Sequence, residues 1–248
     1  MIDHLGVGIT DLAAAAATYR GLGFTLTPYA RHEGSTSPGG ESKPLATANH
    51  CAMFKRGYLE LIAVVDPALP DNGLGSMINE HEGIHIAAFA AEDVQGMVDQ
   101  LRKDGFTANG PIYLERPAAV ENGIGLARFD RIIVPNAEMP EARMFYIKHL
   151  TPEVLWQPRH LVHPNGTAGV VGITFAVDDP EAVLPRFRRF LAVPDKTNVL
   201  ERGGSTCMIL SRDQANDRYY GLLQKNPPFA VAMTLEVESL TKLRMYLD

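Results

Sequence analysis

The sequence predicts an α+β fold in which tandem βαβββ modules pair into a cup-shaped sheet. Three observations indicate this fold. A strand-helix-strand pattern recurs along the chain, aspartates stand where the first three helices begin, and the strand segments alternate between large apolar residues and small or polar ones. A four-stranded sheet with one helix has only one covered face. Two modules are therefore expected to pair and to share a concave surface.

The first module opens with an apolar strand that ends before Asp11, followed by an alanine-rich helix that Gly21 terminates. Three more strands are expected over residues 24–32, 46–54 and 57–64. A Gly/Ser/Pro-rich loop separates the first two of these strands.

The second module repeats this plan with a strand over 83–90, a helix that starts at Asp93, and strands over 106–115, 123–134 and 143–150. A third module begins near Val170, where Pro180 suits the first turn of a helix. A fourth begins at Phe229 and contains one strand and one helix.

These repeats divide the chain into three parts: paired modules over 1–150 that form the cup, a linker over 151–167, and a third module with an incomplete fourth over 168–248. An incomplete module leaves a sheet edge, and exposed edges tend to be protected by pairing. This predicts a homodimer.

Composition restricts the classes of partner. The chain has 248 residues, a formal charge of -6 and a pI near 5.8, which argues against nucleic acid and anionic membranes and favours a small-molecule substrate. The start of the chain lacks the basic and apolar runs of a signal peptide, and no apolar stretch is long enough for a membrane span, so a cytoplasmic location is expected. Cys51 and Cys207 show no spacing typical of a disulfide framework or a zinc site.

Glu60 is the one charged residue in an otherwise apolar strand. Alternation places Tyr58, Glu60 and Ile62 on one face and their neighbours on the other. A buried carboxylate requires a cation, a metal ion or a raised pKa, whereas a solvated face would require none of these.

Two histidines accompany Glu60. His4 and His85 lie in the first strands of modules one and two, and we expect both to face the side that the helices leave open. Two histidines and one carboxylate form the ligand set of non-haem Fe(II) oxygenases, which also suits Mn, Zn, Ni or Co. The sequence therefore predicts a divalent metal, with Fe(II) favoured, held by His4, Glu60 and His85. Each histidine alone would be read as a hydrogen-bonded structural residue.

The segments IDHLGVGITDLAAA, TANHCAMFKRGYLELIAVVDP and LTPEVLWQPRHLVHPNGT resemble the vicinal oxygen chelate superfamily, in particular its glyoxalase-like domain group. The resemblance covers nearly the whole chain. It implies a cup of paired modules with a divalent metal held by residues of the first and last strands, a role that falls on His4, Glu60 and His85. It also implies a substrate that chelates the metal through neighbouring oxygens.

Three functions follow from this resemblance. The first is a metal-dependent enzyme of the glyoxalase/dioxygenase type that cleaves a ring or a C-C bond with dioxygen. The second is a metal-dependent lyase or isomerase that works through an enediolate, with Glu60 as base. The third is a non-catalytic protein that binds small molecules such as drugs in the cup.

The sequence departs from the four-ligand pattern of glyoxalase I. When the alternating pattern of the strand over 143–150 is aligned with that of the strand around Glu60, Tyr146 takes the position of the second glutamate. If the two strands are aligned in another register, Glu141 is the alternative. With an ordinary pKa of about 10, Tyr146 is a poor base but can donate a hydrogen bond to a bound oxygen.

Other polar residues are weaker candidates. His50 is an acid or base if its strand turns it into the cup, and a structural histidine otherwise. Phe89 is expected to form an apolar wall, and Arg128 either clamps a substrate carboxylate or forms a surface ion pair. Arg31 and His32 precede the Gly/Ser-rich loop and either close over an anionic substrate or are solvated loop residues, and the second interpretation is preferred.

Overall fold

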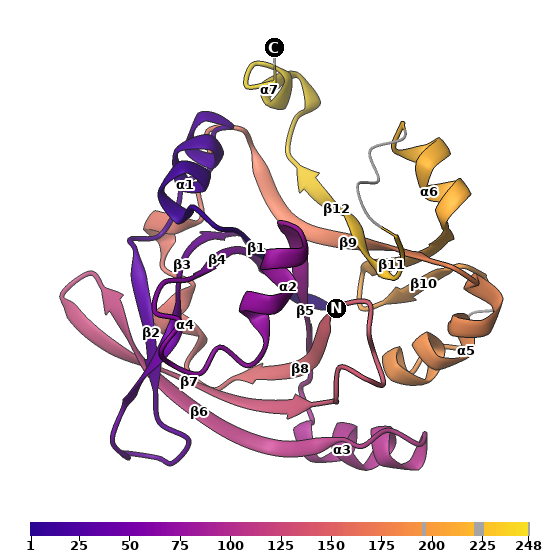
Figure 1. The fold of residues 1–248 in the computed structure, drawn as a ribbon. Helices are drawn as coiled ribbons and strands as arrows, with labels where there is room; N and C mark the ends of the chain where they lie inside the picture. The colour runs from indigo at the N-terminus through magenta and orange to yellow at the C-terminus, as the bar shows by residue number, and fades with distance from the viewer. Residues whose placement is uncertain (195–196, 221–225, 248) are drawn as a thin grey trace.

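A computed structural model of the protein describes residues 1–194, 197–220 and 226–247. The strands of this part of the chain join into one sheet, which Figure 1 shows to be strongly curled. The hydrogen-bonded order is β10-β11-β9-β12-β5-β1-β4-β3-β2, and β6, β7 and β8 extend the sheet from β5. The predicted fold of tandem βαβββ modules forming a curled sheet is confirmed.

The elements follow the modular plan. Module one contains β1 (Ile2–Gly8), α1 (Leu12–Gly21), β2 (Ala30–Gly34), β3 (Lys43–Met53) and β4 (Tyr58–Val64). After α2 (Leu74–Glu80), module two contains β5 (Gly83–Ala90), α3 (Val94–Lys103), β6 (Asn109–Val120), β7 (Gly123–Ile133) and β8 (Arg143–His149).

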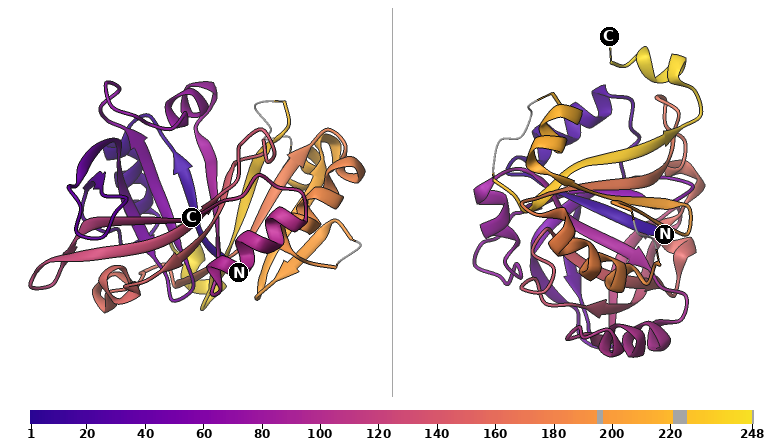
Figure 2. Two further views of the ribbon diagram at one scale, coloured as in Figure 1. Left: turned by 90° about the horizontal axis from the view of Figure 1, so that it is seen from below. Right: turned by 90° about the vertical axis from the view of Figure 1, so that its right-hand side faces the viewer.

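The remaining elements form a shorter second half. A connecting segment holds α4 (Pro152–Leu155) and a 3-10 turn at Pro158–His160, and the third module contains β9 (Thr167–Val177), α5 (Pro180–Leu191), β10 (Val199–Arg202) and β11 (Ser205–Ser211). After α6 (Arg212–Arg218) come β12 (Phe229–Val237) and α7 (Leu240–Arg244). Figure 2 shows this half lying beside the first two modules.

An aspartate caps the helix of each of the first three modules. Asp11, Asp93 and Asp179 each accept a hydrogen bond from the backbone N–H three residues ahead, at 2.9, 2.9 and 3.2 Å. Such caps satisfy N–H groups that the first helical turn leaves without partners. They explain why the helices begin where the sequence predicts.

The two modules of the cup meet at β1 and β5, which pair antiparallel. In each module the first strand also pairs parallel with the last, β1 with β4 and β5 with β8. The outer face of these strands packs under the helices in one apolar cluster, to which α1 contributes Leu12, α3 contributes Val98 and α5 contributes Phe187. Burying each such side chain contributes about 1.5–3 kcal/mol.

The inner face of the sheet is only partly filled. Helix α2 lies within the curve of the sheet (Figure 1), where Leu74 and Ile78 pack on Ile62 and Ile86. The remaining interior stays open and forms the site described below.

The third module is bound tightly to the second. Helix α5 brings Phe190 into contact with three rings of the second module. The ring centroid of Phe190 lies 5.2 Å from that of Tyr146, 5.7 Å from that of Phe89 and 5.8 Å from that of Phe106. Strand β12 inserts between β9 and β5, touching β5 through the pair Ala230 and Ile84. Within the described residues, no helix has both the length and the apolar character needed to cross a membrane.

Candidate functional site

The concave face of the first two modules encloses a cavity of about 180 Å³. Its polar and charged lining comes from seven strands and the loop before α2: His4, His32, Glu33, Thr47, Tyr58, Glu60, Asp71, Asn72, Arg116, Arg131 and Arg143. Apolar walls are supplied by residues that include Ile62, Ile86, Leu114, Phe129, Ile133, Phe145 and Ile147. A second cavity of about 70 Å³ shares Tyr58 and Arg116 with the first.

Glu60 lies in this cavity wall with 8% of its surface exposed. Its Oε1 accepts a hydrogen bond of 2.5 Å from the side-chain amide of Asn49. Burial raises the pKa of the Glu60 carboxyl, but attraction to His32 and His4 and the Asn49 bond outweigh burial and leave the pKa below its ordinary value. Glu60 is thus a carboxylate near neutral pH.

His32 stands beside Glu60. Its Nε2 is 3.6 Å from Glu60 Oε1, and its Nδ1 is 2.7 Å from the Thr47 hydroxyl. Burial lowers the pKa of His32, and Arg116 lowers it further against the opposing pull of Glu60. An imidazole with a lowered pKa beside an ionised carboxylate is an acid–base pair that can exchange protons with a bound molecule.

His4 is oriented by its neighbour in sequence. The Asp3 carboxylate accepts hydrogen bonds from His4 Nδ1 at 2.7 Å and from His149 Nε2 at 3.1 Å. Consecutive strand residues normally face opposite ways. Here the pairing of β1 with β5 shifts register between Ile2 and His4, and this irregularity includes Asp3. His4 also stacks on Tyr58, with ring centroids 4.4 Å apart.

Strand register places Glu60 and Arg143 in one row across the cup. Glu60 pairs with Gly6, Gly6 with Ile86, and Ile86 with Arg143. Three strand spacings separate the outer Cα atoms by about 14 Å in a flat sheet, and the curl of the sheet turns both side chains inward. A Cβ at Gly6 would meet the Ile86 side chain at 2.8 Å, so glycine makes room for Ile86 in the middle of this row.

Of the side chains predicted to form the site, His4 and Glu60 line the cavity together. His85 does not. It lies near α2, where its Nε2 contacts the His81 carbonyl oxygen at 2.8 Å and its ring is 4.5 Å from that of His81.

The placement of His85 follows from a one-residue slip between the modules. His4 stands seven residues before its helix cap Asp11, and the residue seven before Asp93 is Ile86, which does line the cavity. At His85 the pairing of β5 with β1 is irregular, since Gly6 pairs with Ile86 and Val7 with Ile84, so His85 lies in a bulge beside α2.

Tyr146 is displaced by the same slip. Glu60 pairs with the residue two after His4, and the equivalent residue of β5, Ala88, pairs with Phe145. Phe145 lines the cavity, whereas Tyr146 lies fully buried on the helix side and donates a hydrogen bond of 2.7 Å to the Phe190 carbonyl.

Phe89 and Glu141 also lie away from the cup. Phe89 packs with Tyr146 in the helix-side cluster, so the expectation that Phe89 faces the cup is wrong for this strand. Glu141 is buried and pairs with Arg186 of α5, through oxygens 2.5 and 3.0 Å from the guanidinium.

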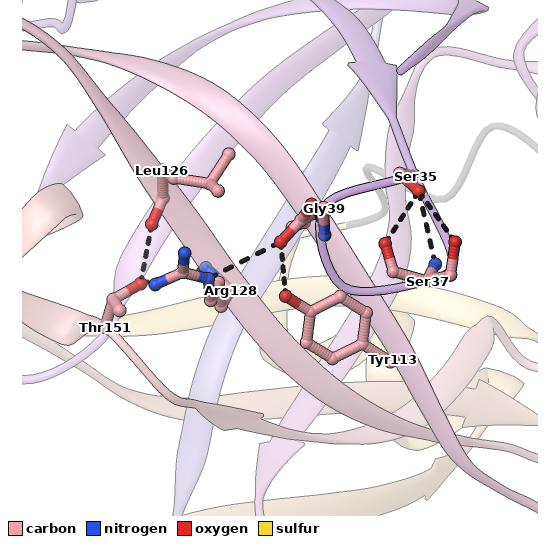
Figure 3. A network of polar contacts seen from close by, with 8 residues as sticks. Ser35, Ser37, Gly39, Tyr113, Leu126, Arg128 and Thr151 are labelled. Atoms are coloured by element: carbon pink, nitrogen blue, oxygen red, sulfur yellow. Dashed lines mark hydrogen bonds and ion pairs between the residues drawn. The ribbon is translucent and has the colours of Figure 1, made fainter. Parts of the chain in front are cut away.

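His50 and Arg128 have local partners outside the cavity. His50 Nδ1 contacts the Thr27 carbonyl oxygen at 2.7 Å. Arg128 pairs with Glu115 at 3.4 Å, and the Tyr113 hydroxyl donates to the same carboxylate (Figure 3). These contacts favour the structural interpretation of both residues.

The described residues do not fit a metal ion held by the three predicted ligands. Since His85 lies outside the cavity, His4 and Glu60 are the members of the trio that share it. In the described ranges of the chain, no group of three or more His, Cys, Asp or Glu side chains could hold a metal ion. The divalent metal stays a prediction, and no chemical step is derived through it below.

Several residues of the cavity were missed by sequence reasoning. His32 lines the cavity although its position suggested a solvated loop; Arg31 does lie exposed and pairs with Asp66. Arg131 and Arg143 were missed too, and the alternation of Arg143 with Phe145 was the available signal. No sequence pattern pointed to Asn49, because its contact with Glu60 depends on the register between β3 and β4.

Comparison with known proteins gives one family and a set of similar folds. The family model of the glyoxalase-like domain matches residues 2–191. A hypothetical protein from Staphylococcus aureus aligns with a TM-score of 0.64 and 13% identity, over 85% of each chain. A comparison with curated proteins gives no match.

Two enzymes with solved structures are also similar. A mutant of 4-hydroxymandelate synthase from Streptomyces coelicolor aligns with a TM-score of 0.54 and 11% identity, over 99% of this chain and 73% of the other. Methylmalonyl-CoA epimerase from Mycobacterium tuberculosis aligns with a TM-score of 0.40 and 17% identity, over 59% of this chain and 85% of the other. At these identities the likeness concerns the fold.

Proposed function

We propose that this chain, which belongs to the glyoxalase-like domain family, uses its cup to bind a small molecule with an acidic C–H bond beside a carbonyl and to move that proton. The observation that carries the proposal is the position of Glu60: an ionised, buried carboxylate in the wall of a cavity large enough for a small molecule. The reaction class is isomerisation, epimerisation or elimination.

The chemistry follows from the protonation states of the lining. Glu60 takes the proton from carbon, and the electron pair of that C–H bond moves to the carbonyl and forms an enolate. The enolate oxygen carries the developing negative charge, which Arg143 in the same row is able to stabilise. The proton then returns to a different atom or face.

His4 and His32 are the candidates for returning the proton. With Nδ1–H bonded to Asp3, the neutral form of His4 keeps its lone pair on Nε2, the nitrogen left for a ligand. His32 Nε2 lies 3.6 Å from Glu60 Oε1, a separation that a proton crosses through one bridging water or through the substrate. Asp3 and Asn49 act as positioning residues: Asp3 holds His4 in a fixed orientation, and Asn49 holds Glu60.

Hydrogen exchange in D₂O tests the proposal without knowledge of the product. Proton NMR would follow the α-hydrogens of 2-oxobutanoate, 4-methyl-2-oxopentanoate and phenylpyruvate with and without the protein. We expect protein-dependent exchange that falls about 10²-fold or more in Glu60→Gln. Glu121→Gln, an exposed glutamate in the β6–β7 turn, is the matched control. Equal exchange by Glu60→Gln and wild type, or none with any of the three acids, would contradict the proposal.

The other two functions predicted from the sequence have distinct tests. Metal-dependent cleavage with dioxygen has two of its three predicted ligands, His4 and Glu60, in the cavity. It requires near-stoichiometric metal in untagged protein by plasma mass spectrometry, lost in His4→Ala and Glu60→Ala. A purely binding function requires ligand affinity with no exchange and no oxygen uptake.

A further inference from the structure

Three arginines converge on the cavity from module two. Arg116 of β6, Arg131 of β7 and Arg143 of β8 all line it. Arg116 lies over the ring of Phe129, 5.8 Å from its centroid. With other described residues, none of the three guanidinium groups makes a side-chain hydrogen bond or an ion pair within 4.0 Å. All three arginines are half-buried, and guanidinium groups withdrawn from solvent are normally paired.

Arg131 is the least satisfied of the three. Its Nε is buried and has no hydrogen-bond partner among the described residues. Burial lowers the pKa of Arg131, and the nearby charge of Arg143 lowers it further. Two like charges in a partly dry cavity destabilise the empty protein, and an anion between them would reverse this effect.

The carboxylates of the lining do not supply that anion. Glu33 is exposed. Asp71 is half-buried and attracts Arg143 without forming an ion pair within 4.0 Å, and its carboxylate accepts hydrogen bonds from the backbone of Gly73 and Gly75. Glu60 is buried but is held by Asn49 and lies beside His32. The cavity interior therefore has three arginines and one engaged carboxylate.

We infer that Arg131 and Arg143 form the binding site for a carboxylate on the substrate, and that the substrate is a small organic acid with an apolar body. Arginine presents a planar fork that matches a carboxylate through two parallel hydrogen bonds. Phe129, Phe145 and Ile147 line the same cavity and provide apolar contact for the rest of the molecule.

This inference rests on the proposed function and makes its substrate class specific. Arg143 interacts electrostatically with both Arg131 and Glu60, so a carboxylate held by the arginines lies near the base. The carbonyl next to the acidic C–H bond then belongs to an organic acid, as in a 2-oxo acid, whose carboxylate and ketone provide neighbouring oxygens.

Isothermal titration calorimetry with the full chain tests the inference. The probes are benzoate, its uncharged isostere benzamide, and phenyl phosphate, and none of them has an enolisable hydrogen. We expect benzoate to bind about 30-fold or more tightly than benzamide. Equal binding of benzoate and benzamide would overturn the inference, and tighter binding of phenyl phosphate would assign the arginines to phosphate instead.

Arg131→Met gives a second readout that a structural role would not produce. We expect the melting temperature of the unliganded variant to rise, because a repelled charge is removed, while benzoate no longer raises it. Arg131→Lys keeps the charge and should retain weaker benzoate binding. Arg20→Met, an exposed arginine of α1, should match wild type in both respects. A melting temperature of Arg131→Met below that of wild type would assign Arg131 to the fold and overturn the inference.

The two proposals fail in different ways. Benzoate binding that depends on Arg131, combined with no exchange of any 2-oxo acid, would keep the carboxylate site and refute proton transfer by Glu60. Exchange that depends on Glu60 but is equally fast for the methyl esters of the same acids would keep proton transfer by Glu60 and refute the carboxylate site.

Discussion

Asp3→Asn should lower the free energy of unfolding by about 2 kcal/mol at pH 7, and the loss should shrink in acid. Asp3 is 7% exposed and holds two histidines, through His4 Nδ1 at 2.7 Å and His149 Nε2 at 3.1 Å. An asparagine retains the shape of the side chain but removes the charge that both N–H groups contact.

The magnitude follows from the pKa of Asp3. Burial raises this pKa, but hydrogen bonds and attraction from His149 and His4 outweigh it and lower the pKa from 3.8 to about 2. A difference of this size between the unfolded and folded states is worth about 2.4 kcal/mol. Because the folded-state pKa is the lower one, the stabilisation is complete well above pH 4 and is lost as the pH falls towards 2. At pH 3 about 1 kcal/mol of it has gone.

Urea unfolding followed by circular dichroism at pH 7, 5 and 3 measures this effect. The difference between wild type and Asp3→Asn should fall from about 2 kcal/mol at pH 7 to about 1 kcal/mol at pH 3. Asp217→Asn, at an exposed position of α6, is the control and should change stability by less than about 0.5 kcal/mol. A difference that stays constant with pH would refute the assignment of the stabilisation to the ionised carboxylate.

Three further predictions concern the fold around the cup. Gly57→Ala should destabilise more than Gly39→Ala by about 1 kcal/mol or more: both residues have positive φ, at 73° and 66°, but only a Cβ at Gly57 would meet a backbone atom, the Asp3 carbonyl oxygen at 2.6 Å. Chemical denaturation of the two variants measures the difference, and equal losses would contradict it. Tyr146→Phe should lower the free energy of unfolding by about 1 kcal/mol, since it removes the buried hydrogen bond to the Phe190 carbonyl. Benzoate binding measured by calorimetry should stay unchanged, and weakened binding would indicate that Tyr146 contacts the ligand in the cup. Light scattering should give the mass of a homodimer, and a mass equal to one chain would remove the prediction drawn from the incomplete fourth module.

The modular fold could be predicted from the sequence because its signals are local. Alternating side chains define each strand, and Asp11, Asp93 and Asp179 mark the helix starts within a few residues of the strands before them. The same signals placed His4 and Glu60 correctly on the open face of their strands. Each of these inferences depends only on neighbouring residues.

The second half of the site needed information that alternation does not contain. To find which residue of module two is equivalent to a given residue of module one, the residues along the strands of both modules must be counted. An error of one residue in this count selected His85 instead of Ile86 and Tyr146 instead of Phe145. Counting back from the caps Asp11 and Asp93 would have avoided the first exchange. The contact of Asp3 with His4 could not be predicted from the sequence, because it occurs at a register irregularity between two strands that are distant in the chain.

The two modules of the cup have the same fold but present different chemistry to the cavity. Module one supplies His4, His32 and Glu60, the groups proposed to hold and exchange protons, and module two supplies Arg131 and Arg143, which carry positive charge. In the proposed reaction these roles must stay apart, because an arginine in direct contact with Glu60 would make the carboxylate a weaker base. The seam between β1 and β5 keeps them apart: two strands separate Glu60 from Arg143, and the Ile86 side chain packs over Gly6 in the row between them. A substrate bound across this seam would contact both sets of side chains, so that its carboxylate is held from one module while the other takes its proton.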